Sequence, residues 1–359
     1  MTDRATDWVR PAVRKLAPYR VAIPPHHIKL NQNESPVELP EPLKAEILDC
    51  LRDIPWSRYP EQGATALAEA LKASLALPEA IDVITGNGSN ELIQALLTAV
   101  LEPGAPIVIP ASTFTLYRQF AAILGAEIIA VPLEADLSLD ADRLAAAARE
   151  AEARAIVLAR PNNPTGTAVP VEAVERMLTR TDALVVVDEA YVEFARDSVV
   201  DLLGTHARLV VLRTFSKALR AAGVRIGYMA AAAELVDEVR KVVPPFNTSV
   251  LDREAALAIV RNLELLRPGI DETIAERERM TEALEEIDGI APIPSEANFI
   301  CFRTDVPPRA VFERLLERGI LVRDVSGYPS LGDFLRVSVG TPAENCAFLA
   351  ALHEIMEER

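Results

Sequence analysis

The sequence predicts an α/β fold: a mostly parallel sheet with helices on both faces, followed by a smaller α+β domain. Between residues 81 and 233, short β-rich runs that are apolar throughout alternate with amphipathic helical stretches. Such strands are typical of a parallel sheet that is covered on both faces. After about residue 248 a long helical region leads into short strands and helices. The 359 residues also exceed what one ordinary hydrophobic core holds.

The N-terminal region is irregular and proline-rich, and it predicts an arm that packs on another part of the protein. Its five prolines are Pro11, Pro18, Pro24, Pro25 and Pro36. Regular helical spacing begins at 41–54 and continues at 63–77. We therefore assign residues 1–28 to the arm, 29–248 to a large α/β domain, and 249–359 to a small α+β domain.

Within the large domain, the pattern predicts strands at 81–85, 106–110, 127–133, 154–159, 183–190, 208–214 and 223–233. Helices such as 90–101 and 171–180 lie between them. The small domain is predicted to contain a helical region at 252–287, strands at 297–303, 320–324 and 334–340, and helices at 311–319 and 342–357. Ligands bind at the carboxyl ends of parallel strands, so the chemistry is expected there.

Composition and charge exclude several classes of protein. The formal net charge of −16 disfavours nucleic acid and anionic membranes as partners. The three cysteines form no CxxC, and the four histidines lack metal-ligand spacing, so we expect no zinc site and no disulfide framework. No signal peptide or apolar span occurs, which favours the cytoplasm. A reactive lysine must be one of six: Lys15, Lys29, Lys44, Lys72, Lys217 and Lys241.

The turn after the first predicted strand contains Gly86, Gly88, Ser89 and Asn90 and opens a helix. Small residues let backbone N–H groups approach an anion, and the helix dipole favours a phosphate there. Glu91 stands where a dinucleotide fingerprint needs its third glycine, so that interpretation fails. By itself this turn indicates a plain helix start as readily as a phosphate site.

Aromatic rings follow the second predicted strand, and side-chain amides follow the fourth. Phe114 and Tyr117 follow the second strand, and either could stack on a flat ring or pack within its helix. The segment RPNNPTG (160–166) follows the fourth strand as a tight polar loop, which alone is compatible with an ordinary turn.

Charged side chains follow the fifth and sixth predicted strands. Asp188 ends a buried strand, where a carboxylate needs a partner such as a protonated ring nitrogen, a basic side chain or a metal ion. Lys217 ends another strand, flanked by Thr214 and Ser216, with Arg225 eight residues later. An amine near an anion pocket can form a Schiff base with a carbonyl group. Together the strand ends provide what a phosphorylated pyridine aldehyde requires.

From residue 16 to residue 345 the chain resembles the fold-type I aminotransferases, which depend on pyridoxal 5′-phosphate (PLP). Three motifs carry the resemblance in the order and spacing of that family: NNPTG (162–166), VVDEAY (186–191) and TFSKA (214–218), the last followed by Arg225.

The resemblance implies a role for each matching residue. Lys217 would form the Schiff base with the cofactor and move the proton, and Asp188 would hold the pyridine nitrogen protonated. Tyr191 and Asn163 would bind the phenolic oxygen of the ring, and Phe114 would stack on its face. The residues implied to hold the cofactor phosphate are Ser89, Asn90, Thr214, Ser216, Arg225 and, from the other subunit of a homodimer, Tyr59.

Further matches point to the histidinol-phosphate branch of the family. LNQNESP (30–36) resembles the start of that branch, and Tyr19 matches an aromatic residue of the arm that covers the substrate. Arg323 and Arg336 match two arginines that would grip the substrate phosphate, with Arg336 also serving a carboxylate. The resemblance implies transamination of L-histidinol phosphate with 2-oxoglutarate in histidine biosynthesis, by a ping-pong scheme.

Two departures leave the substrate open. Phe114 stands near a position where the family often has tyrosine, and Phe246 stands where a tyrosine is common. Aromatic or broad-range aminotransferases differ in such places, and a decarboxylase of a phosphorylated amino acid shares the same cofactor site. A transcription regulator with an aminotransferase domain is disfavoured because residues 1–40 are too short and proline-rich for a DNA-binding module.

Overall fold

The computed structural model describes residues 5–18 and 22–358. Its larger sheet has seven strands in the order β2-β8-β7-β6-β5-β3-β4, and only β8 runs antiparallel to its neighbours. The strands are β2 (Ile81–Asn87), β3 (Pro106–Pro110), β4 (Glu127–Val131), β5 (Ala155–Ala159), β6 (Leu184–Asp188), β7 (Leu209–Thr214) and β8 (Ile226–Ala232). The predicted mostly parallel α/β sheet is therefore confirmed.

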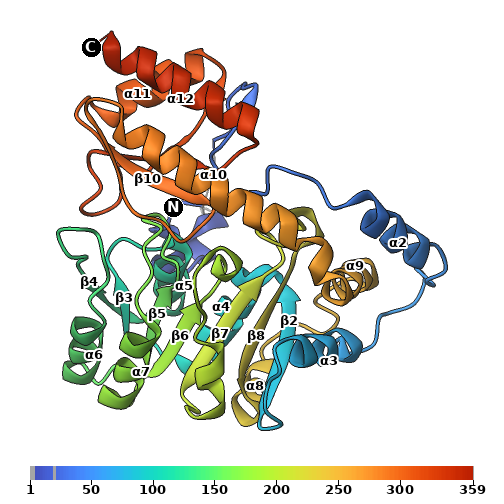
Figure 1. Ribbon diagram of the computed structural model, residues 1–359. Coiled ribbons are helices and arrows are strands. Elements are labelled where there is room, and N and C mark those ends of the chain that lie inside the picture. Colours follow the sequence, from blue (N-terminus) through green and yellow to red (C-terminus); the bar gives the residue numbers. More distant parts are fainter. Residues whose placement is uncertain (1–4, 19–21, 359) are drawn as a thin grey trace.

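Helices cover both faces of this sheet (Figure 1). Side chains alternate along β6, so that Val185 and Val187 enter one hydrophobic core and Val186 enters the other. This explains why the middle of the strand, residues 185–187, is apolar at consecutive positions. The covering helices are α4 (Gly88–Val100), α5 (Thr115–Leu124), α6 (Ala141–Glu150), α7 (Val171–Arg180) and α8 (Ala233–Arg240).

A smaller antiparallel sheet stands above the carboxyl ends of the parallel strands (Figure 1). Its order is β12-β13-β10-β9, with β9 (Ile290–Pro292), β10 (Phe299–Thr304), β12 (Arg323–Asp324) and β13 (Phe334–Ser338). Its own core is covered by α10 (Arg267–Glu285), α11 (Pro308–Glu317) and α12 (Pro342–Glu357). The predicted smaller α+β part is thus present.

The N-terminal segment joins this smaller part. Strand β1 (Ile28–Lys29) pairs in parallel with β11 (Ile320–Leu321), and Leu30 is buried in the small-sheet core. The preceding residues form short helices, η1 (Ala5–Trp8) and α1 (Pro11–Arg14), and α1 contacts α5. Consequently residues 31–34 are held between the two sheets, directly over the strand ends.

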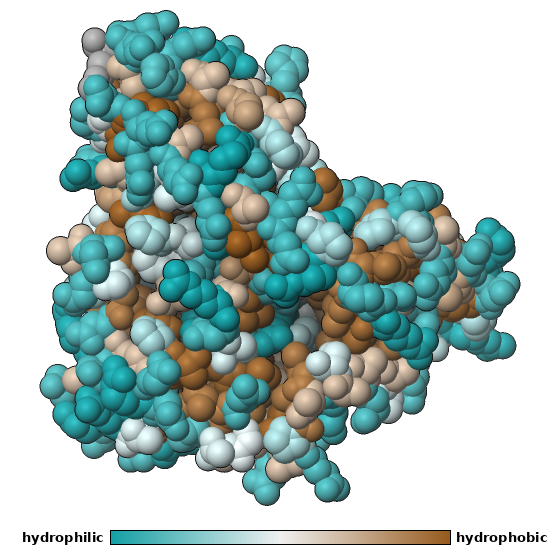
Figure 2. All heavy atoms as spheres, in the orientation of Figure 1, coloured by the Kyte–Doolittle hydropathy of each residue, from teal (hydrophilic) through white to brown (hydrophobic). Residues whose placement is uncertain are grey.

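Helices α2 (Glu41–Arg52), α3 (Thr65–Ser74) and α9 (Val250–Arg261) pack together at one side of the molecule (Figure 1). Figure 2 shows apolar surface where they meet. The predicted helical region at 252–287 is divided between α9, the short η5 (Leu263–Leu265) and α10. Because α9 packs on α2 and α3 whereas α10 reaches the small sheet, the division into domains stays a prediction.

Three short helical turns complete the described chain: η2 (Val192–Phe194), η3 (Val200–Gly204) and η4 (Ala222–Val224). The last of these shortens the strand expected at 223–233, which begins at Ile226 because Arg225 has a left-handed backbone conformation. Within residues 5–18 and 22–358, no helix is both long and apolar enough to cross a membrane.

Candidate active site

A cavity of about 380 Å³ lies where the carboxyl ends of the parallel strands face the small sheet. Twelve of the fourteen residues singled out from the sequence line it: Ser89, Asn90, Phe114, Asn163, Asp188, Tyr191, Thr214, Ser216, Lys217, Arg225, Arg323 and Arg336. Tyr59 is instead 82% exposed and stacks on Phe246, with ring centres 4.6 Å apart. Tyr19 lies outside the described residues.

One corner of the cavity is built for an anion. Helix α4 begins there at Gly88, and the residue before it caps none of the first N–H groups with its side chain. Arg225 contributes its guanidinium, which donates to Ser216 Oγ at 3.3 Å. Thr214 Oγ1 donates to the same oxygen at 3.0 Å. Free helix N–H groups, hydroxyls and a cation together suit a phosphate.

Glycine is required where β8 passes under this corner. A Cβ atom on Gly227 would lie 2.3 Å from the backbone nitrogen of Ser89. Gly88 has a φ of +69°, and a Cβ there would meet the Arg225 guanidinium. Any larger residue at these two positions would therefore push the helix start away from Arg225 or block the corner.

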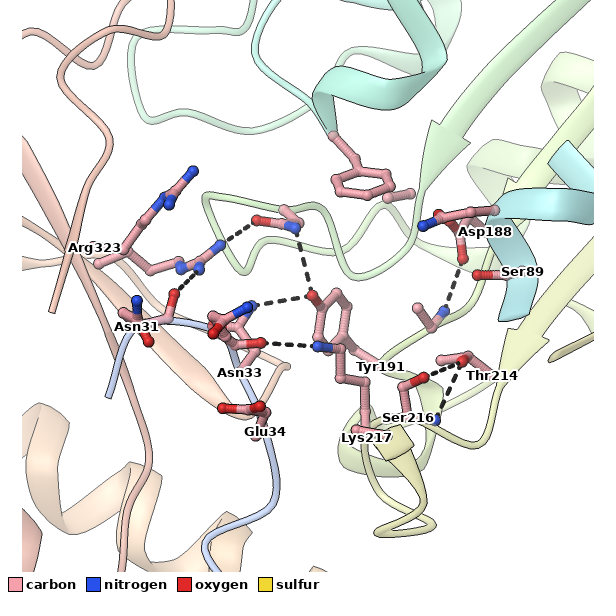
Figure 3. Close-up of a pocket in the computed structure, with 18 of the residues that line it drawn as sticks. Asn31, Asn33, Glu34, Ser89, Asp188, Tyr191, Thr214, Ser216, Lys217 and Arg323 are labelled. Atoms are coloured by element: carbon pink, nitrogen blue, oxygen red, sulfur yellow. Dashed lines mark hydrogen bonds between the residues drawn. The ribbon is translucent and has the colours of Figure 1, made fainter. Parts of the chain in front are cut away.

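Lys217 follows β7 and points its amine into the middle of the cavity. Its Nζ donates to the carbonyl oxygen of Gln32 at 2.9 Å (Figure 3). Burial and, to a smaller extent, the nearby Arg336 guanidinium lower the pKa of Lys217 to about 8. An amine that is readily neutral near physiological pH is a competent nucleophile and proton acceptor.

Asp188 ends β6 and is 4% exposed. It accepts from two neutral donors: Tyr117 Oη at 2.7 Å and the Ala190 N–H at 3.1 Å. Burial raises the pKa of Asp188 to about 6, although the Tyr117 hydrogen bond opposes this effect. The adjacent Glu189 differs, because Arg213 binds it from 2.8 and 3.0 Å. Asp188 is thus a buried carboxylate that a cation entering the cavity would stabilise.

The phenol of Tyr191 stands between Lys217 and the small sheet. It accepts a hydrogen bond from Asn33 Nδ2 at 3.0 Å and a longer one from Asn163 Nδ2 at 3.4 Å. Asn163 is oriented in turn by Arg336, which donates to its Oδ1 at 2.5 Å. Lys217 Nζ lies 5.9 Å from the centre of the Tyr191 ring.

The opposite end of the cavity carries two arginines on neighbouring strands. Arg323 of β12 and Arg336 of β13 are directly paired in the antiparallel register. Figure 3 places Arg323 across the pocket from Ser89 and Thr214. Arg336 Nε is buried without a hydrogen-bond partner among the described residues, as is Asn31 Oδ1 beside it. Such groups are costly unless a ligand satisfies them: the Arg336 N–H needs an acceptor, which indicates a second anion site, whereas the Asn31 oxygen needs a donor.

The sequence reasoning missed several residues that shape this cavity. The sequence predicts only stacking or packing for Tyr117, yet its hydroxyl donates a hydrogen bond to Asp188. The other missed residues are Asn31, Gln32, Asn33, Glu34 and Tyr328. Residues 31–34 belong to LNQNESP, a motif whose sequence predicts no contact with a ligand. No local signal marks Tyr328.

The cavity thus offers an amine, a buried carboxylate and two separate anion sites, which is the arrangement of an enzyme that handles a phosphorylated ring. Residues 25–352 match the family described as aminotransferase class I and II. The chain belongs to this family.

Two relatives and one solved structure extend the likeness. The chain is 40% identical to the histidinol-phosphate aminotransferase of Chlorobium chlorochromatii, covering 98% of this chain and 96% of the relative. It is also 40% identical to histidinol-phosphate aminotransferase 2 of Nitrosococcus oceani, covering 98% of each. The histidinol-phosphate aminotransferase of Sinorhizobium meliloti, solved in complex with pyridoxal 5′-phosphate, superposes with a TM-score of 0.88. It is 27% identical, and the match covers 97% of both chains.

Proposed function

We propose that this aminotransferase uses PLP to move the amino group of L-histidinol phosphate to 2-oxoglutarate. The products would be imidazole acetol phosphate and glutamate, and histidine biosynthesis would use this reversible reaction in the opposite direction, because histidine keeps the amino group. The observation that carries the proposal is that two anion sites face each other across Lys217. Arg323 and Arg336, which are paired on neighbouring strands, form one of them, and the corner at the start of α4 forms the other. Full-length relatives of the same named activity support it.

The residues present fit the cofactor. The corner formed by Ser89, Ser216 and Arg225 suits its phosphate. Asp188 lacks a cation of its own among its hydrogen-bond partners, and a protonated ring nitrogen would supply one. Lys217 Nζ is the amine that would bind the aldehyde covalently.

The remaining cofactor contacts follow from the same cavity. We assign Tyr191 and Asn163 to the phenolic oxygen of the ring and Phe114 to its face, with Asn90 and Thr214 completing the phosphate corner. When bound, the cofactor supplies an electron sink for the charge that develops at the substrate carbon. The protein supplies position, charge and a proton acceptor.

The catalytic work of the chain centres on Lys217. Its pKa near 8 leaves a useful fraction of the amine neutral, and in that form Nζ would take the proton from the substrate carbon and later return one. Asp188 would keep a proton on the ring nitrogen throughout. Arg336 would orient the substrate by binding a carboxylate in one half-reaction and the phosphate in the other, because its planar fork suits both anions.

We further propose a homodimer with a shared active site. Tyr59 is exposed, lies outside the cavity of its own chain and is stacked on Phe246, so it is available to a second copy. A second subunit could use it to complete the phosphate corner. We assign the enzyme to the cytoplasm, which the three unpaired cysteines suit.

The proposal is tested by adding single amines to the purified, yellow, cofactor-loaded protein without any oxo acid. An amino donor removes the visible colour in one half-reaction. We expect histidinol phosphate to do so at far lower concentration than phenylalanine, tyrosine or phosphothreonine. Glutamate should also react, because it is the amino donor when the 2-oxoglutarate half-reaction runs in reverse. If phenylalanine or tyrosine is preferred, the aromatic aminotransferase alternative replaces this substrate assignment.

A further inference from the structure

Asn33 is a buried hub that connects the cavity to the small sheet. It is 1% exposed, and its side-chain amide faces two partners. Nδ2 donates to Tyr191 Oη at 3.0 Å, and Oδ1 accepts from Ser338 Oγ at 3.1 Å. Its backbone N–H donates to the same Ser338 oxygen at 2.8 Å. Figure 3 shows the Asn33 side chain reaching the Tyr191 hydroxyl.

These contacts fix which end of the amide faces Tyr191. Ser338 holds the oxygen end by donating to it and simultaneously accepts from the Asn33 backbone, so the NH₂ end must point to the phenol. The carbonyl of Asn33 accepts from Asn298 Nδ2 at 3.0 Å, which anchors the backbone from a second direction. A side chain held at both ends places its donor accurately.

The backbone of residue 33 restricts what can stand there. Its φ is +55°, in the left-handed region that asparagine, aspartate and glycine tolerate best. Asparagine is the one of these three that can donate a hydrogen bond from its side chain. The strained backbone and the donor role therefore favour the same residue.

We propose that Asn33 is a positioning residue that sets the hydroxyl of Tyr191 for its contact with the cofactor and ties it to the strand of Arg336. The inference rests on the proposed function. A phenol that accepts from an amide becomes a stronger donor, because hydrogen bonds in a chain polarise one another. Asn33 thereby strengthens the donation of Tyr191 to the phenolic oxygen of the ring. Ser338 lies two residues after Arg336 in β13, so the same strand holds the substrate anion and Asn33.

Other charged and titratable groups face Tyr191 and share its electrostatic environment. Lys217 lies over the ring, and Arg336 and Tyr117 interact with the phenol electrostatically from β13 and α5. Their positions are unchanged in the substitutions below, which alter residue 33 alone. A change in titration that also occurs in Asn33→Gly, which adds no charge, can then be assigned to the amide.

The test is a pH titration of the visible absorbance of the cofactor-loaded protein. Asn33→Asp keeps the shape, the backbone and the acceptor for Ser338, but it replaces the donor to Tyr191 by an acceptor that competes for the phenolic proton. We expect its absorbance midpoint to rise by about one pH unit, and kcat to fall about tenfold with KM for the amino donor within about twofold. Asn33→Gly, which only removes the amide, should give a smaller rise in the same direction.

Asn298→Ala is the matched control, because it removes a hydrogen bond to residue 33 yet leaves the amide on Tyr191. It should lower the melting temperature and keep the wild-type midpoint. Wild-type midpoints in both Asn33 variants would overturn the inference, as would an equal shift in Asn298→Ala. A purified, PLP-treated wild-type protein without any visible band would instead refute the proposed cofactor. If Asn33→Asp does not fold, the direction of the shift in Asn33→Gly decides.

Discussion

Tyr117 Oη donates a hydrogen bond of 2.7 Å to Asp188 Oδ2, which joins α5 to the end of β6 inside the fold. Tyr117 is fully buried, and burial raises its pKa well above the ordinary value, so the phenol stays a neutral donor. The bond lowers the pKa of Asp188, whereas burial raises it by more. The pKa of Asp188 therefore stays close enough to neutral pH for an approaching cation to ionise the carboxyl group fully.

Replacing Tyr117 by Phe should raise the pKa of Asp188 above its present value of about 6, because burial would then act without the opposing hydrogen bond. Asp188 would be more protonated at neutral pH and would bind a ring cation less well. We expect cofactor affinity of the apoprotein to fall about tenfold at pH 7, the loss typical of one hydrogen bond to a charged group. Equilibrium titration with PLP measures it. Unchanged affinity between pH 6 and 8 would contradict this role of Tyr117.

The lowered pKa of Lys217 predicts how fast the apoprotein reacts with the cofactor. Only the neutral amine attacks the aldehyde, and its fraction rises as pH increases through about 8 rather than through the ordinary value of 10.5. Stopped-flow absorbance should therefore show a rate that levels off above about pH 8 to 9. Lys217→Arg keeps the positive charge and should abolish both this reaction and turnover. Substantial transamination by that variant would refute the assignment of Lys217.

Arg323→Ala should affect the phosphate substrate more than the carboxylate substrate. Arg336 remains to bind either anion, but a phosphate with more charge loses more when the second arginine is removed. We expect kcat/KM for histidinol phosphate to fall about 100-fold and that for glutamate less than about fivefold. Steady-state kinetics of the two half-reactions gives both values. Equal losses would remove the phosphate-specific role, while Arg336→Ala should weaken both substrates.

Glu189 and Arg213 form a buried ion pair beside the site, with exposed fractions of 0% and 9% for their side chains. Glu189→Ala should lower the free energy of unfolding by about 3–5 kcal/mol, because it leaves a buried guanidinium without its counter-charge. Glu189→Leu combined with Arg213→Met should recover much of that loss. Denaturant unfolding of the apoprotein compares the three proteins. If the double variant is no more stable than Glu189→Ala, an uncompensated charge is not the cause.

Mixing two inactive variants tests the shared site. In a dimer that pairs Lys217→Arg with Tyr59→Ala, one site carries both substitutions and the other is intact. Random exchange of subunits should then restore about one quarter of wild-type activity, since half the dimers are mixed and each has one working site. Each variant incubated alone is the control. No recovery after proven exchange would place Tyr59 outside its partner's site.

The large sheet could be predicted because its physical signals are local. Residues 184–187 are apolar at every position, and the structure buries that strand between two cores. The rule that ligands bind at the carboxyl ends of parallel strands then predicts Ser89, Asp188 and Lys217 in one region. All three line the same cavity.

The residues that were missed depend on contacts between distant segments. Tyr117 and Asp188 are 71 residues apart, and Asn33 and Ser338 are 305 apart. Nothing in the residues around Tyr117 shows that its hydroxyl meets a carboxylate rather than packing within its helix. The two-residue strand β1 is too short to have a recognisable period, so its pairing with β11 could not be foreseen either.

That pairing of β1 with β11 has a consequence for biosynthesis. Residues 28–34, which pair with β11 and close the cavity over Lys217, leave the ribosome long before their partners on β11 and β13. The large sheet can form while translation continues, but its upper wall cannot assemble until the C-terminal region has emerged. Until then the pocket around Lys217 stays open, so we expect stable capture of PLP to be a late event in the synthesis of each new molecule.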